Sequence, residues 1–498
     1  MPSSPHILVG APVSQYIRQC DPAPLLLENI EIHSIPRDQI VSTLNHTIPV
    51  SIVPGLKRIP LSHEYTLVCS PDHATAILAL DTAAQQVLAF FQKARSIAEL
   101  SQLAAIPDAQ QIAERLLAHG LLLASQKPMV RVAAIDTLSV WLHVTNACNL
   151  ACSYCYVAKT NEAMDEVTGL QAIDTAIAAA KRHHYARIAI KYAGGEAALN
   201  FRLVRLLHEY AQQRTQAEGL LLSEAVLSNG TTLTPARLTF LRDAQIGLMI
   251  SLDGPAPAHD LQRPFVHGNA SAKQVIAGID RALQLGIRPD INIVVSAHSA
   301  PYLVETLRLV LDRGLRFSLN FVRDHGVGFD DPALRQDVIT QGMLAAFAEL
   351  ARILPRERVI DGLVDFTTFD GMRQQVCGAG ASLLVIDQQG RVARCQTELQ
   401  RPVSHIRNPD PLMDIRLEPS GFQALRPTDK SECSSCTWRH WCAGGCPAYT
   451  YQMTGRNDLQ SPYCAVYKRL YPKVLELEGM RLLKWAKSGA HHGVEVWV

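Results

Sequence analysis

The chain has 498 residues, 48% of them hydrophobic, which is too long for one ordinary domain and sufficient for more than one buried core. Its 47 basic and 46 acidic residues give a formal net charge of +1, so nothing in the bulk charge favours nucleic acid or an anionic membrane as a partner. Neither a secretion signal nor a run of about 18 apolar residues is present, and we therefore expect a cytoplasmic protein.

The first quarter of the chain predicts a small mixed module over residues 58–125, after an extension over 1–57 that carries no assignable pattern. A helix begins at Thr82, with Gln85 at capping-box spacing. The last helix of the module contains a single basic residue, Arg115, which argues against DNA binding. The pattern is typical of a winged-helix-like (α+β) module with strands over 65–69, 76–80 and 121–123 and helices from 82, over 96–104 and over 108–119.

From residue 136 to 355 the pattern changes to alternating strands and helices. Six such βα units imply a parallel sheet with right-handed crossovers and an α/β fold class. We expect strands over 140–144, 188–192, 224–228, 248–252, 292–296 and 316–321.

Ten of the twelve cysteines fall into two spaced arrays, and the first of them follows the first predicted strand. Cys148, Cys152 and Cys155 place three thiolates within eight residues, so an iron–sulfur cubane bound there would keep one iron open. A zinc knuckle is the alternative, but His143, the nearest further ligand, lies within a predicted strand. Clustered cysteines in a chain without an export signal indicate metal binding in a reducing compartment.

The segment from Cys148 to Cys155 resembles the C-x3-C-x-aromatic-C signature of the radical S-adenosylmethionine (SAM) superfamily. The resemblance implies that the open iron of a [4Fe-4S] cluster binds SAM, that an electron cleaves its sulfonium, and that a 5′-deoxyadenosyl radical abstracts a substrate hydrogen. Cys148, Cys152 and Cys155 are then the catalytic cluster ligands. It further implies that the six βα units form a partial (β/α)6 TIM-like barrel with its site at the C-terminal strand ends.

A second motif, Gly194-Gly195-Glu196, follows the second strand and resembles the family's Gly-Gly-Glu-Pro segment, with Ala197 in place of the proline. Glycines permit close backbone approach, and the resemblance implies that the carboxylate binds the methionyl amino group. The segment from His259 to Arg263 resembles one whose arginine pairs with the methionyl carboxylate. Expected cofactor contacts are Tyr154 against the adenine, Gly194, Gly195, Glu196, Ser228, Ser251 and Arg263, whereas Asn229 and Asp253 are expected mainly as turn residues.

The second cysteine array resembles the SPASM domain, which carries two auxiliary [4Fe-4S] clusters, and we expect this domain over 370–470, followed by a C-terminal helix and tail over 471–498. A pair of zinc ribbons is the alternative, but seven ligands fill one four-thiolate site and leave three. Gly371 stands where fully ligated relatives carry a further cysteine, so the first auxiliary cluster has an open iron or serves electron transfer. The resemblance assigns Cys377, Cys395 and Cys446 to the first auxiliary cluster, and Cys433, Cys436, Cys442 and Cys464 to the second.

In its modules the chain resembles anaerobic sulfatase maturases, but Gln396 replaces their proton-accepting aspartate, and an amide is no general base at neutral pH. We therefore expect a ribosomally made peptide or protein as the substrate, modified by cross-linking, thioether formation, epimerisation or a similar change. The N-terminal module resembles domains that capture a leader peptide as an added strand, or is purely structural. A flavodoxin or ferredoxin is the expected electron donor. Small-molecule oxidation and a non-catalytic electron carrier are alternatives, and a carrier would not need Glu196 and Arg263.

Overall fold

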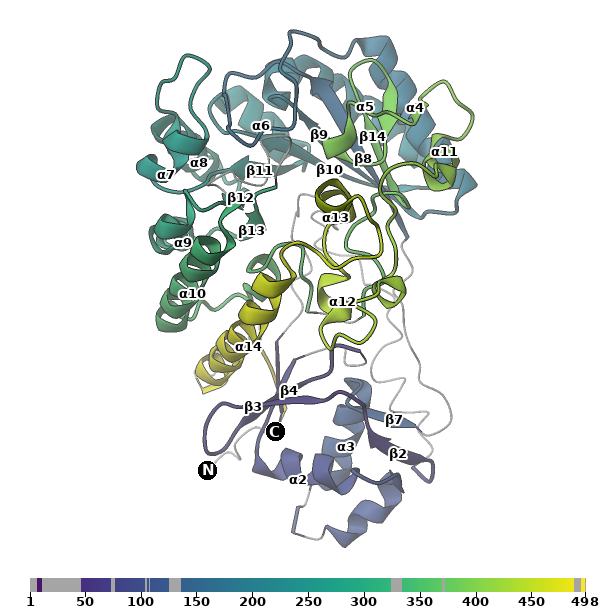
Figure 1. Cartoon of the computed structure of the whole chain (residues 1–498), viewed down its shortest axis with the longest axis vertical. Helices are drawn as coiled ribbons and strands as arrows, with labels where there is room; N and C mark the ends of the chain where they lie inside the picture. Colours follow the sequence, from purple (N-terminus) through teal and green to yellow (C-terminus); the bar gives the residue numbers. More distant parts are fainter. Residues whose placement is uncertain are drawn as a thin grey trace.

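The computed structural model describes residues 7–10, 46–72, 77–103, 105–106, 108–124, 136–323, 334–369, 372–487 and 494–497. Figure 1 shows a large α/β part, a smaller N-terminal module, and the elements α12 (Arg439–Cys442) and α14 (Cys464–Lys487) between them. In the described part of the chain, no helix combines the length and the apolar character that crossing a membrane requires.

A nine-stranded sheet forms the centre of the large part, in the order β13-β12-β11-β10-β9-β8-β14-β15-β16. The first six strands of this sheet along the chain are parallel, and those that follow one another in the sequence pair with each other. Each of them also overlaps an expected strand, which confirms the α/β class. They are β8 (Thr137–Thr145), β9 (Arg187–Gly194), β10 (Leu221–Ser228), β11 (Gly247–Ser251), β12 (Asp290–Val295) and β13 (Phe317–Phe321).

The helices that follow these strands pack against the sheet (Figure 1). In β8, Val140 and Leu142 belong to the core beneath the helices, whereas Trp141 points to the other face and a separate cluster. Alternation along a strand thus delivers one row of side chains to the core and the other to the pocket. The helices are α4 (Glu166–Arg182), α5 (Phe201–Ala217), α6 (Pro235–Asp243), α7 (Ala256–Gln262), α8 (Ala272–Gln284), α9 (Leu303–Leu311) and α10 (Gln336–Ile353).

The C-terminal part of the chain extends the same sheet, which the sequence did not predict. β14 (Leu383–Ile386) lies parallel to β8, and β15 (Arg391–Ala393) and β16 (Ser404–His405) continue it antiparallel. The second cysteine array therefore starts close to β8, the strand that leads into the first cysteine array. The remaining helices of this part are α11 (Pro411–Leu417), α13 (Pro447–Thr454) and α14, which packs against α10.

The N-terminal module contains two sheets with α2 (Thr82–Phe90) and α3 (Ala109–Ala118). Both sheets recruit strands from outside the expected range 58–125, because strand pairing joins segments that are far apart in the sequence. One sheet has the order β6-β2-β7, formed by β6 (Arg95–Ser96), β2 (Pro49–Ile52) and β7 (Leu122–Ala124). The other has the order β17-β1-β5-β4-β3, formed by β17 (Val494–Trp497), β1 (Ile7–Gly10), β5 (Leu78–Leu80), β4 (Thr66–Cys69) and β3 (Lys57–Pro60).

Two local expectations in this module were wrong. The residue that caps α2 is Asp81 rather than Thr82, since its carboxylate accepts a hydrogen bond from Ala84 N at 2.8 Å. The helix expected over 96–104 is a 3-10 turn, η1 (Ile97–Gln102), which begins with a capping box between Ser96 and Glu99.

Candidate functional site

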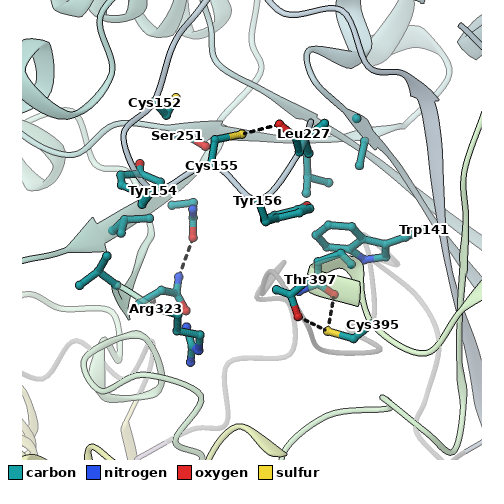
Figure 2. Close-up of a pocket in the computed structure, with 18 of the residues that line it drawn as sticks. Trp141, Cys152, Tyr154, Cys155, Tyr156, Leu227, Ser251, Arg323, Cys395 and Thr397 are labelled. Atoms are coloured by element: carbon teal, nitrogen blue, oxygen red, sulfur yellow. Dashed lines mark hydrogen bonds between the residues drawn. The ribbon is translucent and has the colours of Figure 1, made fainter. Parts of the chain in front are cut away.

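One pocket lies at the C-terminal ends of the parallel strands, and residues from both cysteine arrays line it. Figure 2 shows Cys155 and Cys395 on its walls, with the rings of Tyr156 and Trp141 in the region between them. Trp141, Tyr156 and Cys395 also belong to one packed apolar cluster. The lining cysteines are Cys148, Cys152 and Cys155 from the first array and Cys377, Cys395 and Cys446 from the second.

The three thiols after β8 are partly buried in the loop that enters the pocket. Burial raises the pKa of Cys148 to about 11, and burial likewise raises the pKa of Cys152. At neutral pH such groups remain protonated thiols unless a metal takes the place of the proton. The chemistry of this donor set therefore fits a metal cluster, which stabilises the thiolate form.

The two glycines of the second motif pack against the backbone of this cysteine loop. Gly194 has φ +139°, and a Cβ there would lie 2.1 Å from Thr145 O. A Cβ on Gly195 would lie 2.4 Å from Ala147 O. Gly195 N donates a hydrogen bond to Thr145 O at 2.8 Å, and Glu196 N donates one to Ala147 O at 2.9 Å. The glycines thus fix the end of β9 to the loop that holds the cysteines.

Replacing Gly195 with alanine is expected to displace the cysteine loop, because the new methyl group would meet backbone that cannot rotate away. We expect a loss of about 1–3 kcal/mol in the free energy of unfolding, and a lower iron content after reconstitution. Gly219→Ala is the control for iron content, since nothing lies within 4 Å of a Cβ at that position, although its φ of +68° means that alanine there costs about 1 kcal/mol of stability by itself. Thermal unfolding and iron analysis measure both effects, and equal iron contents in the two variants would contradict the packing argument.

Glu196 is 1% exposed and is held by three donors. Its carboxylate accepts hydrogen bonds from Asn229 N at 2.7 Å, Ser228 Oγ at 2.8 Å and Ala198 N at 3.2 Å. Burial raises the pKa of Glu196, and these hydrogen bonds and Arg263 oppose that effect. A carboxylate has about four acceptor positions, so one remains for a further donor such as an ammonium group.

Asn229 is a turn residue as expected, since its Oδ1 accepts a hydrogen bond from Thr231 N at 3.0 Å, but it also has contacts beyond the turn. Its side chain donates to Asn149 Oδ1 at 2.8 Å, between the first two cysteines of the loop. Its backbone amide donates to Glu196, and its side-chain amide lies 4.0 Å from Cys148 Sγ. Asn229 therefore connects the end of β10 to the cysteine loop, whereas Ser228 orients the Glu196 carboxylate.

Asp253, also expected mainly as a turn residue, is a fully buried acceptor beside the pocket. It accepts hydrogen bonds from Tyr154 OH at 2.5 Å, Gln262 Nε2 at 3.0 Å and Val294 N at 3.0 Å. The Asp-Gly sequence after the fourth strand resembles an ordinary turn, and only the folded chain brings it to Tyr154 and Arg263. The sequence signal that could have identified it is its place directly after a predicted strand.

Arg263 completes this network from the end of α7. Its Nη1 donates to Tyr154 OH at 2.6 Å and lies 4.0 Å from Asp253 Oδ2. Its Nε is buried, and no acceptor contacts it among the described residues. Arg263 lines the pocket, and a buried guanidinium group with a spare donor suits a carboxylate ligand, as expected for the methionyl end of SAM. The Tyr154 hydroxyl points into this network, and Tyr154 itself lines the pocket together with Ser251.

Three further polar residues line the pocket, and sequence reasoning missed them: Asn292 within β12, Asn320 near the end of β13, and Arg323 just after it. Asn320 Nδ2 donates to Asn292 Oδ1 at 2.6 Å. Arg323 forms a bidentate pair with the buried Asp365, with Nη2 at 3.0 and 2.9 Å from its two oxygens. Tyr467, in α14, donates to Asp365 at 2.7 Å. For Asn320 and Arg323, the available signal was their place at the C-terminal end of a predicted strand.

The three cysteines of the second array that line the pocket come from separate segments. Cys395 lies two residues after the end of β15, and its sulfur lies 3.4 Å from Gln396 Oε1 and 3.3 Å from Thr397 Oγ1. Gln396 is 6% exposed and lines the pocket. Gly371, the position expected to lack a fourth ligand, lies outside the described residues.

The four other cysteines of this array, Cys433, Cys436, Cys442 and Cys464, influence one another electrostatically. Burial raises the pKa of Cys433 to about 12, and the neighbouring thiolates add to that rise. Among the described residues, no three His, Cys, Asp or Glu side chains are arranged around a single metal ion. The grouping into clusters therefore rests on cysteine spacing and on these shared surroundings.

A family model described as Radical SAM superfamily matches residues 142–310. An uncharacterized protein of Methanocaldococcus jannaschii is 30% identical over 181 residues, 36% of this chain and 60% of that protein. The serine-type anaerobic sulfatase-maturating enzyme of Klebsiella aerogenes is 25% identical over 350 residues, 66% of this chain and 83% of that enzyme.

Among solved structures, native anSMEcpe with bound AdoMet and Cp18Cys peptide shares the fold with a TM-score of 0.57 at 18% identity, over 71% of this chain and 99% of that chain. The matched range 142–310 contains the three-cysteine loop, the glycine motif and Arg263. Residues 142–310 thus form a radical SAM superfamily region, and the chain as a whole is similar to the sulfatase-maturating enzymes.

Proposed function

We propose that this chain is a radical SAM enzyme that modifies a side chain or backbone carbon of a ribosomally made peptide or protein. The observation that carries the proposal is that one pocket is lined by two cysteine triads and by the residues expected to hold SAM. An electron carrier would not need buried carboxylate and guanidinium groups directed at such a pocket. The described site therefore favours catalysis over simple electron storage.

In this proposal Cys148, Cys152 and Cys155 hold the catalytic [4Fe-4S] cluster, which when bound supplies the electron that divides SAM into methionine and a 5′-deoxyadenosyl radical. Glu196 accepts the methionyl ammonium group at its remaining acceptor position. Arg263 donates its unpartnered Nε–H to the methionyl carboxylate. Ser228, Gly194 and Gly195 act by holding these groups, and Ser251 and Tyr154 contact the nucleoside.

Two auxiliary clusters complete the proposed cofactor set. Cys377, Cys395 and Cys446 are the ligands of the first, and they line the same pocket as the catalytic cysteines. The second is bound by Cys433, Cys436, Cys442 and Cys464, of which none lines that pocket. We assign these ligands to a SPASM domain beside the barrel, and the first cluster thus lies where a substrate would be placed.

The substrate region of the pocket combines an apolar wall with a few polar groups. Trp141, Tyr156 and Leu227 form the wall, and Arg323 and Asn320 lie at the ends of the last strands. Such a mixture suits one residue of a larger chain, whose side chain is buried while its backbone hydrogen-bonds. A bound peptide is present in the structure of anSMEcpe, which has the same fold over 71% of this chain.

Formylglycine formation remains disfavoured because Gln396, and not an aspartate, follows Cys395 in the pocket. Among the described residues that line the pocket, Glu196 is the one carboxylate, and it is already bound by three donors. Within the described part of the chain, the pocket therefore offers no free carboxylate as a base for a reaction that needs one beside the substrate. Cross-linking, thioether formation or epimerisation is the proposed reaction class.

The proposed partners are a peptide with a leader segment and a low-potential donor such as flavodoxin or ferredoxin, in the cytoplasm. The strand β3 ends its five-stranded sheet in the strand order, and an edge strand can accept an added peptide strand. We propose this edge of the winged-helix-like module as the leader site, with no role for nucleic acid or membrane.

The experiment that tests the proposal uses peptides encoded near this chain's own gene, made with deuterium at individual residue types. Each is incubated anaerobically with the reconstituted enzyme, SAM and dithionite, and 5′-deoxyadenosine is examined by mass spectrometry. We expect 5′-deoxyadenosine to gain deuterium from one labelled residue type, together with a matching mass change in the peptide. Deuterium transfer from small metabolites but from no peptide would contradict the substrate class.

A further inference from the structure

A buried lysine lies between the two groups of auxiliary cysteines. Lys430 is 1% exposed, and its ammonium group donates one hydrogen bond, to Gly444 O at 3.3 Å. Gly444 lies in the segment that joins Cys442, from the four-cysteine group, to Cys446, from the group that lines the pocket, and Lys430 O accepts a hydrogen bond from Cys433 N at 3.2 Å. One cation thus faces both groups.

The backbone opposite this lysine is shaped around it. Residues 443–445 join Cys442 to Cys446, and all three have positive φ, with values of 46°, 79° and 73°. A Cβ on Gly444 would lie 2.9 Å from Lys430 Cδ and 3.0 Å from its Nζ. A left-handed turn with a glycine at its centre is therefore what allows the ammonium group to reach this position.

The ammonium group has no carboxylate partner within ion-pair distance in the part of the chain that the structure describes. Asp458 acts on it from farther away and is itself paired with Arg456 at 2.6 Å. A buried charge without compensation costs several kcal/mol, so the charge of Lys430 needs an anion nearby.

We propose that Lys430 is the shared countercharge of the two auxiliary clusters, an inference that rests on the proposed function because both clusters must be bound. A [4Fe-4S] core with four thiolates carries a net charge of about −2, and one with three carries about −1. A fixed cation beside them stabilises the additional electron of the reduced state. Lys430 therefore raises the reduction potentials of both clusters, since net charge and hydrogen bonding set these potentials.

Lys468 provides a matched comparison on the other side of the four-cysteine group. It is exposed and lies one helical turn after Cys464 in α14. Water screens an exposed charge much more than a buried one. Its influence should therefore be weak and restricted to the second auxiliary cluster.

The experiment compares Lys430→Met and Lys468→Met in the full-length, reconstituted chain in which the three catalytic cysteines are replaced by alanine, so that only auxiliary clusters contribute to the spectrum. Electron paramagnetic resonance follows the reduced fraction of each cluster at fixed potentials. In Lys430→Met we expect the reduced-to-oxidised ratio to fall by about tenfold for both clusters, which corresponds to about 59 mV for a one-electron couple. In Lys468→Met we expect the reduction potential of the second auxiliary cluster alone to change, and by less than in Lys430→Met.

A second measurement separates this role from simple packing. After iron is removed by chelation, Lys430→Met is expected to unfold at or above the wild-type temperature, because an uncompensated buried charge has been removed. Unchanged potentials of both clusters in Lys430→Met would overturn the inference, as would a variant that is destabilised only in its iron-free form. A wild-type protein that binds iron only at the catalytic cysteines contradicts the two-cluster proposal itself, and this inference with it.

Discussion

Replacing Cys148, Cys152 and Cys155 together with alanine is expected to reduce 5′-deoxyadenosine formation to the level seen with reductant and SAM alone. These residues are the cysteines of the matched radical SAM region that line the pocket beside Glu196 and Arg263. The auxiliary cysteines belong to other segments, so their iron should be retained. Iron should fall from roughly twelve to roughly eight atoms per chain, as one of three cubanes is lost.

The control for this variant is Cys69→Ala, which removes a buried cysteine that belongs to neither array. Burial raises the pKa of Cys69 to about 12, so it is an inert thiol in the N-terminal module. Both SAM cleavage and iron content should remain at wild-type values in the control. Continued cleavage by the triple variant would remove these three cysteines from the catalytic role.

Replacing Arg263 with methionine is expected to weaken SAM binding by at least about thirtyfold, because truncating one partner of a buried charge pair costs about 2–5 kcal/mol of binding. The change also leaves the fully buried Asp253 without its nearby cation. Breaking such a pair lowers the free energy of unfolding by about 3–5 kcal/mol. Equilibrium dialysis with SAM and chemical unfolding measure the two effects separately.

A double variant distinguishes lost binding from lost folding. Asp253→Asn combined with Arg263→Met removes both charges of the pair, so part of the stability should return while SAM binding stays weak. Tyr154→Phe, which keeps both charges, should bind SAM more tightly than either variant. If the folded double variant bound SAM as well as the wild type, Arg263 would have no role in holding the cofactor.

The repeating strands were predictable because each has its own local pattern. All six expected strands of the α/β part are present, since alternating apolar residues and the helices between them are properties of short segments. The motifs of the site were predictable for the same reason. The cysteine spacing and the two glycines are local, and each stands directly after a strand.

Contacts between distant segments were not predictable. No local pattern indicates that β14 pairs with β8, or that β1 and β17 complete a sheet of the N-terminal module. The role of Asp253 was missed for the same reason, since its partners Tyr154 and Val294 lie 99 and 41 residues away along the chain. Turn sequences such as Asn-Gly and Asp-Gly are common, so their chemistry is visible only when the partners are known.

The measurement that tests the central claim most directly is the anaerobic formation of 5′-deoxyadenosine. The chain is reconstituted with iron and sulfide, its cluster content is determined, and SAM and a strong reductant are added with and without a peptide substrate. Our account predicts 5′-deoxyadenosine and methionine in equal amounts, and none from the triple cysteine variant. A fully loaded wild-type protein that binds SAM but forms no 5′-deoxyadenosine, even with peptide present, would contradict it.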